Sequence, residues 1–197
     1  MTDARPPTPP TTDDQLRQAT VGEPTRLDGP IRLAEYDPRW PQLFAREAQR
    51  IRTTLGDRAI RIEHVGSTAV PGLVAKPIID IILVVTDSSD EPSYAPALEG
   101  AGYVLRIREP GWHEHRLFKG PVTAVNLHVF SFGSSEIEWT IALRDRLRSD
   151  PADRELYARA KRELASRTWR YVQNYADAKS EVIGEILSRA GATTTTG

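Results

Sequence analysis

The sequence predicts an α+β domain, with one mixed central sheet, helices on its faces and further helices packed on it at the carboxyl end. Short runs rich in Ile, Leu and Val occur at residues 60–65 and 78–85, and three more runs with the pattern of strands follow between residues 103 and 132. Such runs are typical of strands. Segments whose apolar residues recur at helical spacing stand before, between and after them, so strands and helices are expected to share one core.

The chain shows the signals of a helix before the first of these runs. Asp37 is a good N-cap, Pro38 suits the first helical position, and Gly56 stands where the helix is expected to end. The apolar residues between them recur at helical spacing, namely Trp40, Leu43, Phe44, Ile51 and Leu55. We also expect a short edge strand at residues 31–33 and a short helix at residues 91–101.

The second half of the chain is expected to hold three strands and three helices. Ser135 with Glu138 fits a capping box for the first helix, and Asp150 followed by Pro151 opens the second. Trp139 has core spacing on its helix, so we expect it to be a packing residue rather than a platform for a nucleobase. The strands are expected at residues 103–108, 115–119 and 122–132, and the helices at 136–148, 151–167 and 169–189.

Length and composition suit one folded domain at residues 29–190. Residues 1–28 are rich in Pro, Thr and Asp, so we expect a disordered leader there, and an unstructured tail at residues 191–197. The 26 basic and 27 acidic residues nearly cancel, which argues against nucleic acid or an anionic membrane as a partner. The absence of cysteine excludes disulfides and thiolate chemistry. No apolar run reaches 18 residues, so a cytoplasmic protein is expected.

One carboxylate interrupts the most apolar of the predicted strands. Residues 78–85 are otherwise all Ile, Leu and Val, which is the composition of a strand buried on both faces, and Asp80 lies among them. A buried carboxylate is costly unless it is paired or binds a metal ion. Asp80 is therefore a candidate metal ligand, and the alternative is a structural ion pair with Lys76 or with an arginine of a helix.

Gly66 and Ser67 follow the first strand of this pair at a corner made of small residues. Glycine lets the backbone approach a phosphate, and the serine hydroxyl and the amides of the next turn can donate to it. An ordinary Gly-Ser turn is the alternative. The order of strand, Gly-Ser, short connection and Asp80 in the next strand resembles the signature of nucleotidyltransferases, in which Gly-Ser holds a triphosphate and two carboxylates hold magnesium.

The segment HVGSTAVPGLVAKPIIDI more specifically resembles the GrpB family, which shares this fold. The segments YDPRWPQLF, NLHV and LRDRLRSDP and the Tyr-x-x-x-Lys repeats are similar too, so the likeness covers residues 31–190. The resemblance implies that Gly66 and Ser67 bind a nucleoside triphosphate and that Asp80 binds Mg²⁺. It also implies transfer of a nucleotidyl group to a small acceptor, or adenylation of that acceptor.

The sequence departs from the nucleotidyltransferase pattern at one position. Residue 82 points to the same face of a strand as Asp80, and it is Ile82 rather than a second carboxylate. Metal-dependent transfer normally needs two or three carboxylates close together. The candidates to complete the site are Glu63, His64, Asn126 and His128.

Among these, His128 could share the metal or act as a general base, and a hydrogen-bonded pocket histidine is the alternative. If the metal pair is missing, the protein is a non-catalytic module that binds a nucleotide or a CoA-related molecule. GrpB-like domains fused to dephospho-CoA kinase point in that direction. The third alternative is a structural protein whose charged residues pair only with each other.

The basic residues that are candidates for holding phosphate are Lys76, Arg144, Lys161 and Lys179, and Arg116 and Lys119, which flank a strand, could serve likewise. Lys76 stands just before the strand of Asp80. Lys161 and Lys179 each follow a tyrosine by four residues on the apolar side of a helix, where solvation alone would not place a lysine. They either point into an anion-binding pocket or snorkel past the edge of the core. A surface ion pair on a helix explains Arg144 equally well.

Overall fold

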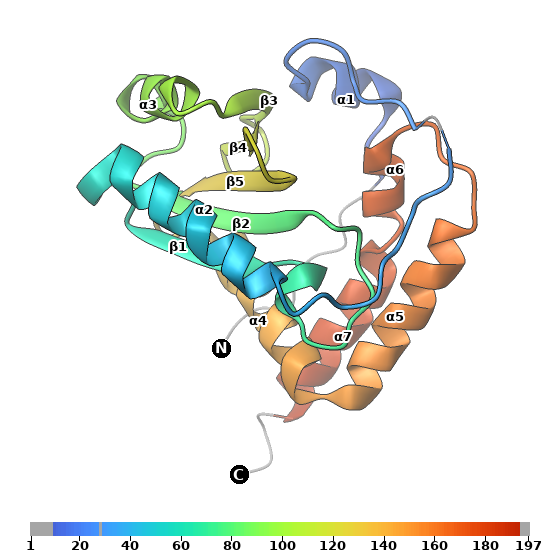
Figure 1. Cartoon of the computed structure of the whole chain (residues 1–197). Helices are drawn as coiled ribbons and strands as arrows, with labels where there is room; N and C mark the ends of the chain where they lie inside the picture. Colours follow the sequence, from blue (N-terminus) through green and yellow to red (C-terminus); the bar gives the residue numbers. More distant parts are fainter. Residues whose placement is uncertain (1–9, 28, 194–197) are drawn as a thin grey trace.

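The computed structural model of this chain describes residues 10–27 and 29–193. Its centre is a five-stranded mixed sheet in the order β1-β2-β5-β4-β3 (Figure 1). β2 and β5 run parallel, and the other neighbouring strands are antiparallel. The strands are β1 (Arg61–Val65), β2 (Ile79–Val85), β3 (Val104–Glu109), β4 (His115–Lys119) and β5 (Val125–Ser131). The predicted α+β class is confirmed.

The helices cover both faces of this sheet. α2 lies across one face with α3 beside it, while α4 lies against the other face and packs with α5 and α7 (Figure 1). The helices are α1 (Asp13–Ala19), α2 (Trp40–Leu55), α3 (Ala95–Gly100), α4 (Ser135–Ser149), α5 (Pro151–Ala165), α6 (Val172–Asp177) and α7 (Ser180–Thr193). No helix among the described residues is both long enough and apolar enough to cross a membrane.

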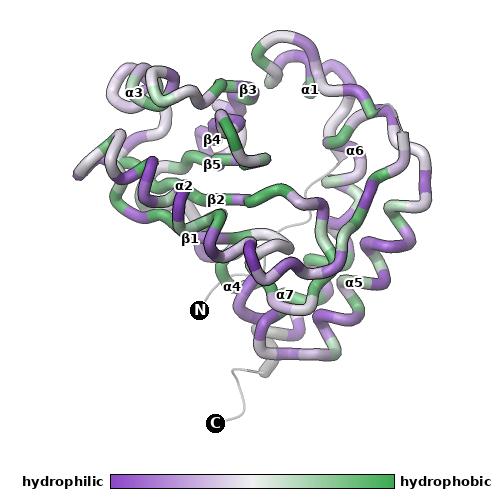
Figure 2. Tube along the Cα trace, viewed as in Figure 1, coloured by the Kyte–Doolittle hydropathy of each residue, from purple (hydrophilic) through white to green (hydrophobic). Residues whose placement is uncertain are grey.

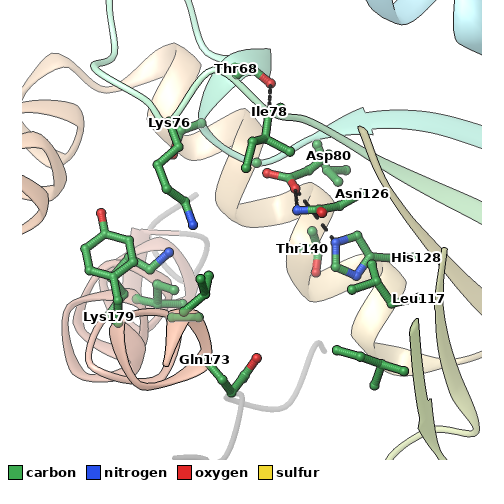
Figure 3. A pocket seen from close by; sticks show the side chains of 18 of the residues that line it. Thr68, Lys76, Ile78, Asp80, Leu117, Asn126, His128, Thr140, Gln173 and Lys179 are labelled. Atoms are coloured by element: carbon green, nitrogen blue, oxygen red, sulfur yellow. Dashed lines mark hydrogen bonds and ion pairs between the residues drawn. The ribbon is translucent and has the colours of Figure 1, made fainter. Parts of the chain in front are cut away.

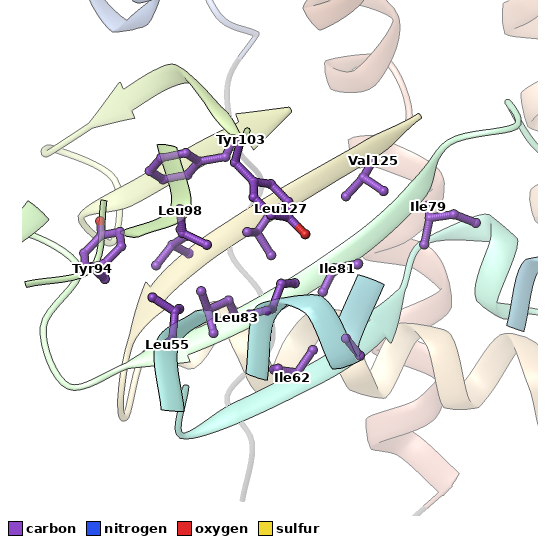
Figure 4. Close-up of a cluster of buried hydrophobic side chains, with 14 of the residues drawn as sticks. Leu55, Ile62, Ile79, Ile81, Leu83, Tyr94, Leu98, Tyr103, Val125 and Leu127 are labelled. Carbon is purple, nitrogen blue, oxygen red and sulfur yellow. The ribbon is translucent and has the colours of Figure 1, made fainter. Parts of the chain in front are cut away.

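The main core lies between the sheet and α2. Alternate residues of β2, such as Ile81 and Leu83, point into it together with Leu127 of β5 (Figure 4). Ile82 of the same strand points the other way, toward α4. Because both of its faces are covered, β2 is apolar except for Asp80 (Figure 2). Each branched side chain buried in this way stabilises the fold by roughly 1.5–3 kcal/mol.

The predicted element boundaries need three corrections. α2 begins at Trp40 rather than at Pro38, and Asp37 accepts a hydrogen bond from the Arg39 amide just before it, at 2.9 Å. Instead of a strand, residues 31–33 lead into an isolated bridge between Ala34 and Ala75. The expected capping box of α4 is absent, because Ser134 is the N-cap.

The predicted final helix is broken into α6 and α7. The Ala178 amide donates to the Asn174 carbonyl at 3.1 Å, and the Lys179 amide donates to the Ala176 carbonyl at 3.3 Å. These bonds form a tight turn that ends α6 and changes the direction of the chain before α7. Lys179 lies in this turn, between two helices.

The predicted leader is partly ordered. Residues 13–19 form α1, which Thr12 and Gln15 open with a capping box. Leu16 of α1 is buried, and the Val21 amide donates to the Arg106 carbonyl of β3 at 2.8 Å. α7 extends to residue 193, past the predicted end of the domain at 190. The remaining parts of the predicted leader and tail, residues 1–9, 28 and 194–197, lie outside the described residues.

Candidate functional site

A cavity of 780 Å³ opens on the face of the sheet that α4 only partly covers. Asp80 of β2 and Asn126 and His128 of β5 line it from the sheet side. Lys76, from the connection before β2, and Lys179, from the turn between α6 and α7, reach toward the same space from the opposite side (Figure 3). Segments far apart in the sequence therefore converge on one site.

Asp80 is placed in the cavity by the alternation of β2 and is held there by its neighbours. It pairs across the sheet with Val65 and Asn126. Its Oδ1 accepts a hydrogen bond from Asn126 Nδ2 at 2.7 Å and lies 3.9 Å from His128 Nε2. Burial works toward a higher pKa of Asp80, but His128, Asn126 and the charge of Lys179 outweigh it and hold that pKa below its usual value. The side chain is therefore a carboxylate at neutral pH.

Gly66 packs directly against this carboxylate. Its φ is +67°, a conformation that favours glycine, and a Cβ atom at this position would lie 2.4 Å from Asp80 Oδ2. Ser67 follows at the start of a short 3₁₀ helix, Ser67–Ala69, and lines the cavity. The structure thus brings Gly66, Ser67 and Asp80 together, as the sequence predicts. Any larger residue at position 66 would clash with Asp80, which explains why glycine stands there.

All four lysines of the chain line this one cavity, whereas the other 22 basic residues of the sequence are arginines, of which Arg32 and Arg106 line it. The cavity lysines, as we call them, are Lys76, Lys119, Lys161 and Lys179. Lysine is a compact point charge whose pKa responds readily to burial. Such a concentration of amines creates a positively charged site.

Lys76 and Lys179 share one aromatic partner. Their Nζ atoms lie 5.3 and 4.8 Å from the centre of the Tyr175 ring, which is within the range of cation–π attraction. Burial and the charge of Lys76 lower the pKa of Lys179 to about 8, against the opposing effect of Asp80. Burial likewise lowers the pKa of Lys76. One carboxylate does not fully compensate these two amines.

The other two cavity lysines have partners within the protein. Lys161 is buried and donates to the Val74 carbonyl, and burial together with Lys179 lowers its pKa to about 7. Lys119 donates to Oδ1 of Asn126, the residue that bonds Asp80. Burial lowers the pKa of Lys119, and Asp80 opposes this shift. Lys161 therefore supports the wall of the cavity, while Lys119 extends the polar network around Asp80.

Comparisons with known proteins agree with this architecture. The family model described as "GrpB protein" matches residues 30–189, which is most of the chain. The chain belongs to the GrpB family. A UPF0157 protein of Halalkalibacterium halodurans is 61% identical, with 93% of this chain and 94% of that protein covered. The crystal structure of conserved protein GrpB from Enterococcus faecalis has a TM-score of 0.70 and 32% identity, with 81% of this chain and 99% of that chain covered.

A more distant relative of this GrpB-family chain carries a second name. It is called dephospho-CoA kinase, comes from Mycolicibacterium paratuberculosis and is 29% identical over 82% of this chain. The alignment covers only 46% of that protein, so the chain spans about half of its length.

Three residues predicted for the GrpB site lie elsewhere. Arg144 donates to Glu63 at 2.7 Å and to Asp145 at 2.8 Å and is not part of the cavity lining. Glu63 is thereby held in an ion pair at the α4 side of β1. His64 points to the opposite face of the sheet, where its ring stacks on Phe44 at 4.7 Å. Arg144, Glu63 and His64 are thus explained by packing and ion pairing.

Other residues of the site escaped the sequence analysis. Trp139 lines the cavity, although its spacing indicated packing alone, and Trp112 lines it too. His115 of β4 contacts His128, and Glu109 of β3 contacts His115. Alternation along residues 115–119 places His115 on the same face of β4 as Lys119, which is the signal that could have connected it with the site.

The donor set around Asp80 fits poorly to the Mg²⁺ that the resemblance implies. Mg²⁺ prefers six oxygen ligands in a nearly ideal octahedron. Asn126 turns its amino group toward Asp80 and its oxygen toward Lys119, and the next residue on this face of β2 is Ile82. Among the described residues, no group of three His, Cys, Asp or Glu side chains could hold a metal ion. We therefore derive no chemical step through magnesium.

We expect Lys161→Met to remove a pH-dependent cost from the fold. The pKa of Lys161 is about 7 in the fold against 10.5 for a free lysine, so the unfolded chain binds this proton more tightly. The destabilisation by Lys161 is therefore absent at pH values above the pKa of the unfolded chain and grows as the pH falls. It is complete at pH values below the pKa in the fold. Urea denaturation should show the variant gaining about 3 kcal/mol more over wild type near pH 7 than near pH 9.5. An equal difference at both pH values would contradict the assignment.

Proposed function

We propose that this GrpB-family protein binds a nucleotide or a related phosphorylated small molecule, with the phosphate held by the cavity lysines. The observation that carries the proposal is the gathering of every lysine of the chain in one cavity. Arg32 and Arg106 add to this charge, and the acidic residues of the lining are Asp80 and Glu136. An anionic ligand supplies the negative charge that these amines need, because bringing positive charges together is costly without it.

The dimensions of the cavity support a ligand of nucleotide size. Its 780 Å³ falls within the range of about 300–1,000 Å³ that is usual for small-molecule sites. Trp112, Trp139 and Phe130 line it in addition to the polar residues. A planar aromatic group of the ligand can pack on such side chains while its phosphate remains at the lysines.

Nucleotidyl transfer to a small acceptor, or adenylation of that acceptor, is the second candidate function. The close packing of Gly66 on Asp80 supports it, because this places a Gly-Ser corner beside an invariably charged carboxylate at neutral pH. The donor set around Asp80 is the observation against a magnesium-dependent version of this chemistry. We therefore rank ligand binding first.

CoA-type molecules belong in the ligand search as well. The relative called dephospho-CoA kinase contains a segment similar to this chain. CoA and dephospho-CoA combine a nucleotide with a long polar arm, and a cavity of this size with a lysine cluster suits their phosphates. We include both as members of the proposed ligand class.

A thermal-shift panel tests the proposal. It compares the four ribonucleoside triphosphates, CoA and dephospho-CoA, each with EDTA and with Mg²⁺. A ligand at a hundred times its Kd stabilises a protein by about 2.7 kcal/mol, which shifts the Tm of a domain of this size by several degrees. We expect at least one ligand to shift the Tm in EDTA, and a panel without any shift contradicts the proposal.

The same set of ligands, assayed also for product formation, separates the two candidate functions. Product formation in the presence of Mg²⁺, measured by chromatography with each triphosphate and lost in Asp80→Asn, supports nucleotidyl transfer. A Tm shift that is equal in EDTA and Mg²⁺ and yields no product supports ligand binding alone.

A further inference from the structure

A segment that precedes the family match forms one wall of the cavity. The match begins at residue 30, and residues 10–27, which we call the flap, come before it. Figure 1 shows α1, which belongs to the flap, between α6 and the β3 edge of the sheet. The flap residues that line the cavity are Leu16, Thr20, Thr25 and Leu27. The proposed function gives this wall no role.

The flap is attached near both of its ends to the segment that contains α6. At one end the Thr11 amide donates to Asp177 Oδ2 of α6 at 2.8 Å. At the other end the Leu27 amide donates to the carbonyl of Arg170, just before α6, at 3.2 Å. Arg170 also forms an ion pair with Asp13 at the start of α1. The flap therefore stands on two legs that share one short segment of the chain.

The middle of the flap crosses to the opposite wall and meets β3. Thr20 pairs with Ile107 in an isolated antiparallel bridge, and the Val21 amide donates to the Arg106 carbonyl at 2.8 Å. Arg106 Nη2 in turn donates to the Glu23 carbonyl at 3.0 Å. We call these contacts the latch. Because Thr20, Arg106 and Ile107 line the cavity, the latch is part of its wall.

The attachment of the flap is weak compared with that of the central strands. α1 buries one side chain, that of Leu16. The side chains of Arg170 and Asp13 are 55% and 35% exposed, so their ion pair adds little stability. Segments with few buried apolar contacts open locally at a small cost in free energy. Since both legs lie on one side and the latch on the other, release of the latch frees the flap from the sheet and leaves the legs in place.

We propose that the flap is a hinged cover of the cavity. Its latch on β3 releases to admit a small molecule and closes again behind it, while its legs stay on the segment of α6. The inference concerns access to the cavity and is independent of which molecule the cavity binds. A closed flap excludes water from the cavity lysines, and interactions between an amine and an anion are stronger in such an environment than in water.

A reversible cross-link across the latch tests the flap. The chain has no cysteine, so Thr20→Cys/Ile107→Cys introduces a single pair of thiols. In an antiparallel pair whose neighbours carry the hydrogen bonds, as here, the two Cα atoms lie about 4.5 Å apart, which a disulfide can span. Oxidation then locks the flap, and a phosphine reductant releases it.

The readout is the access of a neutral, soluble nitroxide to the cavity of the full-length protein, measured by nuclear magnetic resonance relaxation. The reporter is the side-chain amide of Asn126, which lines the cavity and bonds Asp80. Asn174, the other asparagine of the chain, lies outside this lining and serves as the reference. We expect the relaxation enhancement at Asn126 to fall at least about threefold on oxidation and to return on reduction, with Asn174 unchanged.

Two results of this experiment overturn the proposal. If the enhancement at Asn126 is the same in the oxidised and the reduced protein, the flap does not control access to the cavity. If the two thiols do not cross-link under oxidation, the flap does not rest on β3.

Leu16→Asp tests the flap from the opposite direction. It replaces the one residue that α1 buries with a carboxylate, which is costly to bury, so the open state is favoured. We expect the enhancement at Asn126 to rise at least about threefold over wild type. Gln18→Asp adds the same charge at an exposed position of the same helix and should leave the enhancement unchanged. An unchanged enhancement in Leu16→Asp contradicts the proposal, and the cross-linked pair decides the question where this variant does not fold.

Discussion

Gly66→Ala is expected to lower the free energy of unfolding by about 3 kcal/mol or more. Two effects add up at this position. The φ of +67° is strained for any residue with a Cβ atom, and such strain costs of order 1–3 kcal/mol. The new Cβ would also lie 2.4 Å from Asp80 Oδ2, so the carboxylate or the corner must move. Urea denaturation of the variant and the wild type measures the difference.

Two comparisons separate the strain from the clash. Gly72 has a similar φ of +77°, but nothing lies within 4 Å of its Cβ position, so Gly72→Ala should cost only the strain. Asp80→Ala in the Gly66→Ala background removes the clashing oxygen and should recover part of the stability. If Gly66→Ala and Gly72→Ala cost the same, Gly66 does not support the carboxylate.

The double variant Lys76→Met/Lys179→Met is expected to weaken the binding of any ligand found in the nucleotide panel by about 100-fold or more. Each amine that meets a phosphate forms a charge-assisted hydrogen bond, worth about 1.5–3 kcal/mol. The fold should persist, because both side chains are held mainly by the Tyr175 ring rather than by ion pairs. Calorimetric titration with the same ligand measures the loss.

Arg144→Met is the matched control for this double variant. The sequence assigns Arg144 to the phosphate as well, whereas the structure pairs it with Glu63 and Asp145 outside the cavity. The substitution should therefore lower stability and leave ligand affinity within about twofold of wild type. Wild-type affinity in Lys76→Met/Lys179→Met, or a 100-fold loss in Arg144→Met, would place the phosphate elsewhere.

The sequence is informative about the fold wherever burial imposes a period. β2 could be predicted because burial of both of its faces leaves an apolar run in the sequence. β5 could be predicted because apolar and polar residues alternate along its first half. α1 could not, since Leu16 is its single buried residue and the helix forms by packing on β3. The break at Lys179 also escaped, because the apolar spacing continues through the turn.

The candidate site was predictable only in part, for a similar reason. Asp80 stands out because a lone carboxylate in an apolar strand is costly. The line from Glu109 through His115 to His128 depends on β3, β4 and β5 being neighbours, and strand order is a property of the folded chain. Arg144 was wrongly assigned to the site, because the sequence around a basic residue on a helix does not show whether its side chain faces a ligand or a glutamate.

The confinement of lysine to the cavity has a consequence for chemical labelling. Reagents that acylate or reductively methylate primary amines react with lysine and the chain terminus, and arginine is inert to them. Every lysine of this protein lines the same cavity, and the lowered pKa of Lys179, about 8, leaves a larger fraction of that amine unprotonated and nucleophilic. The extent of lysine modification therefore reports on the accessibility of this one cavity, because no lysine lies elsewhere on the protein.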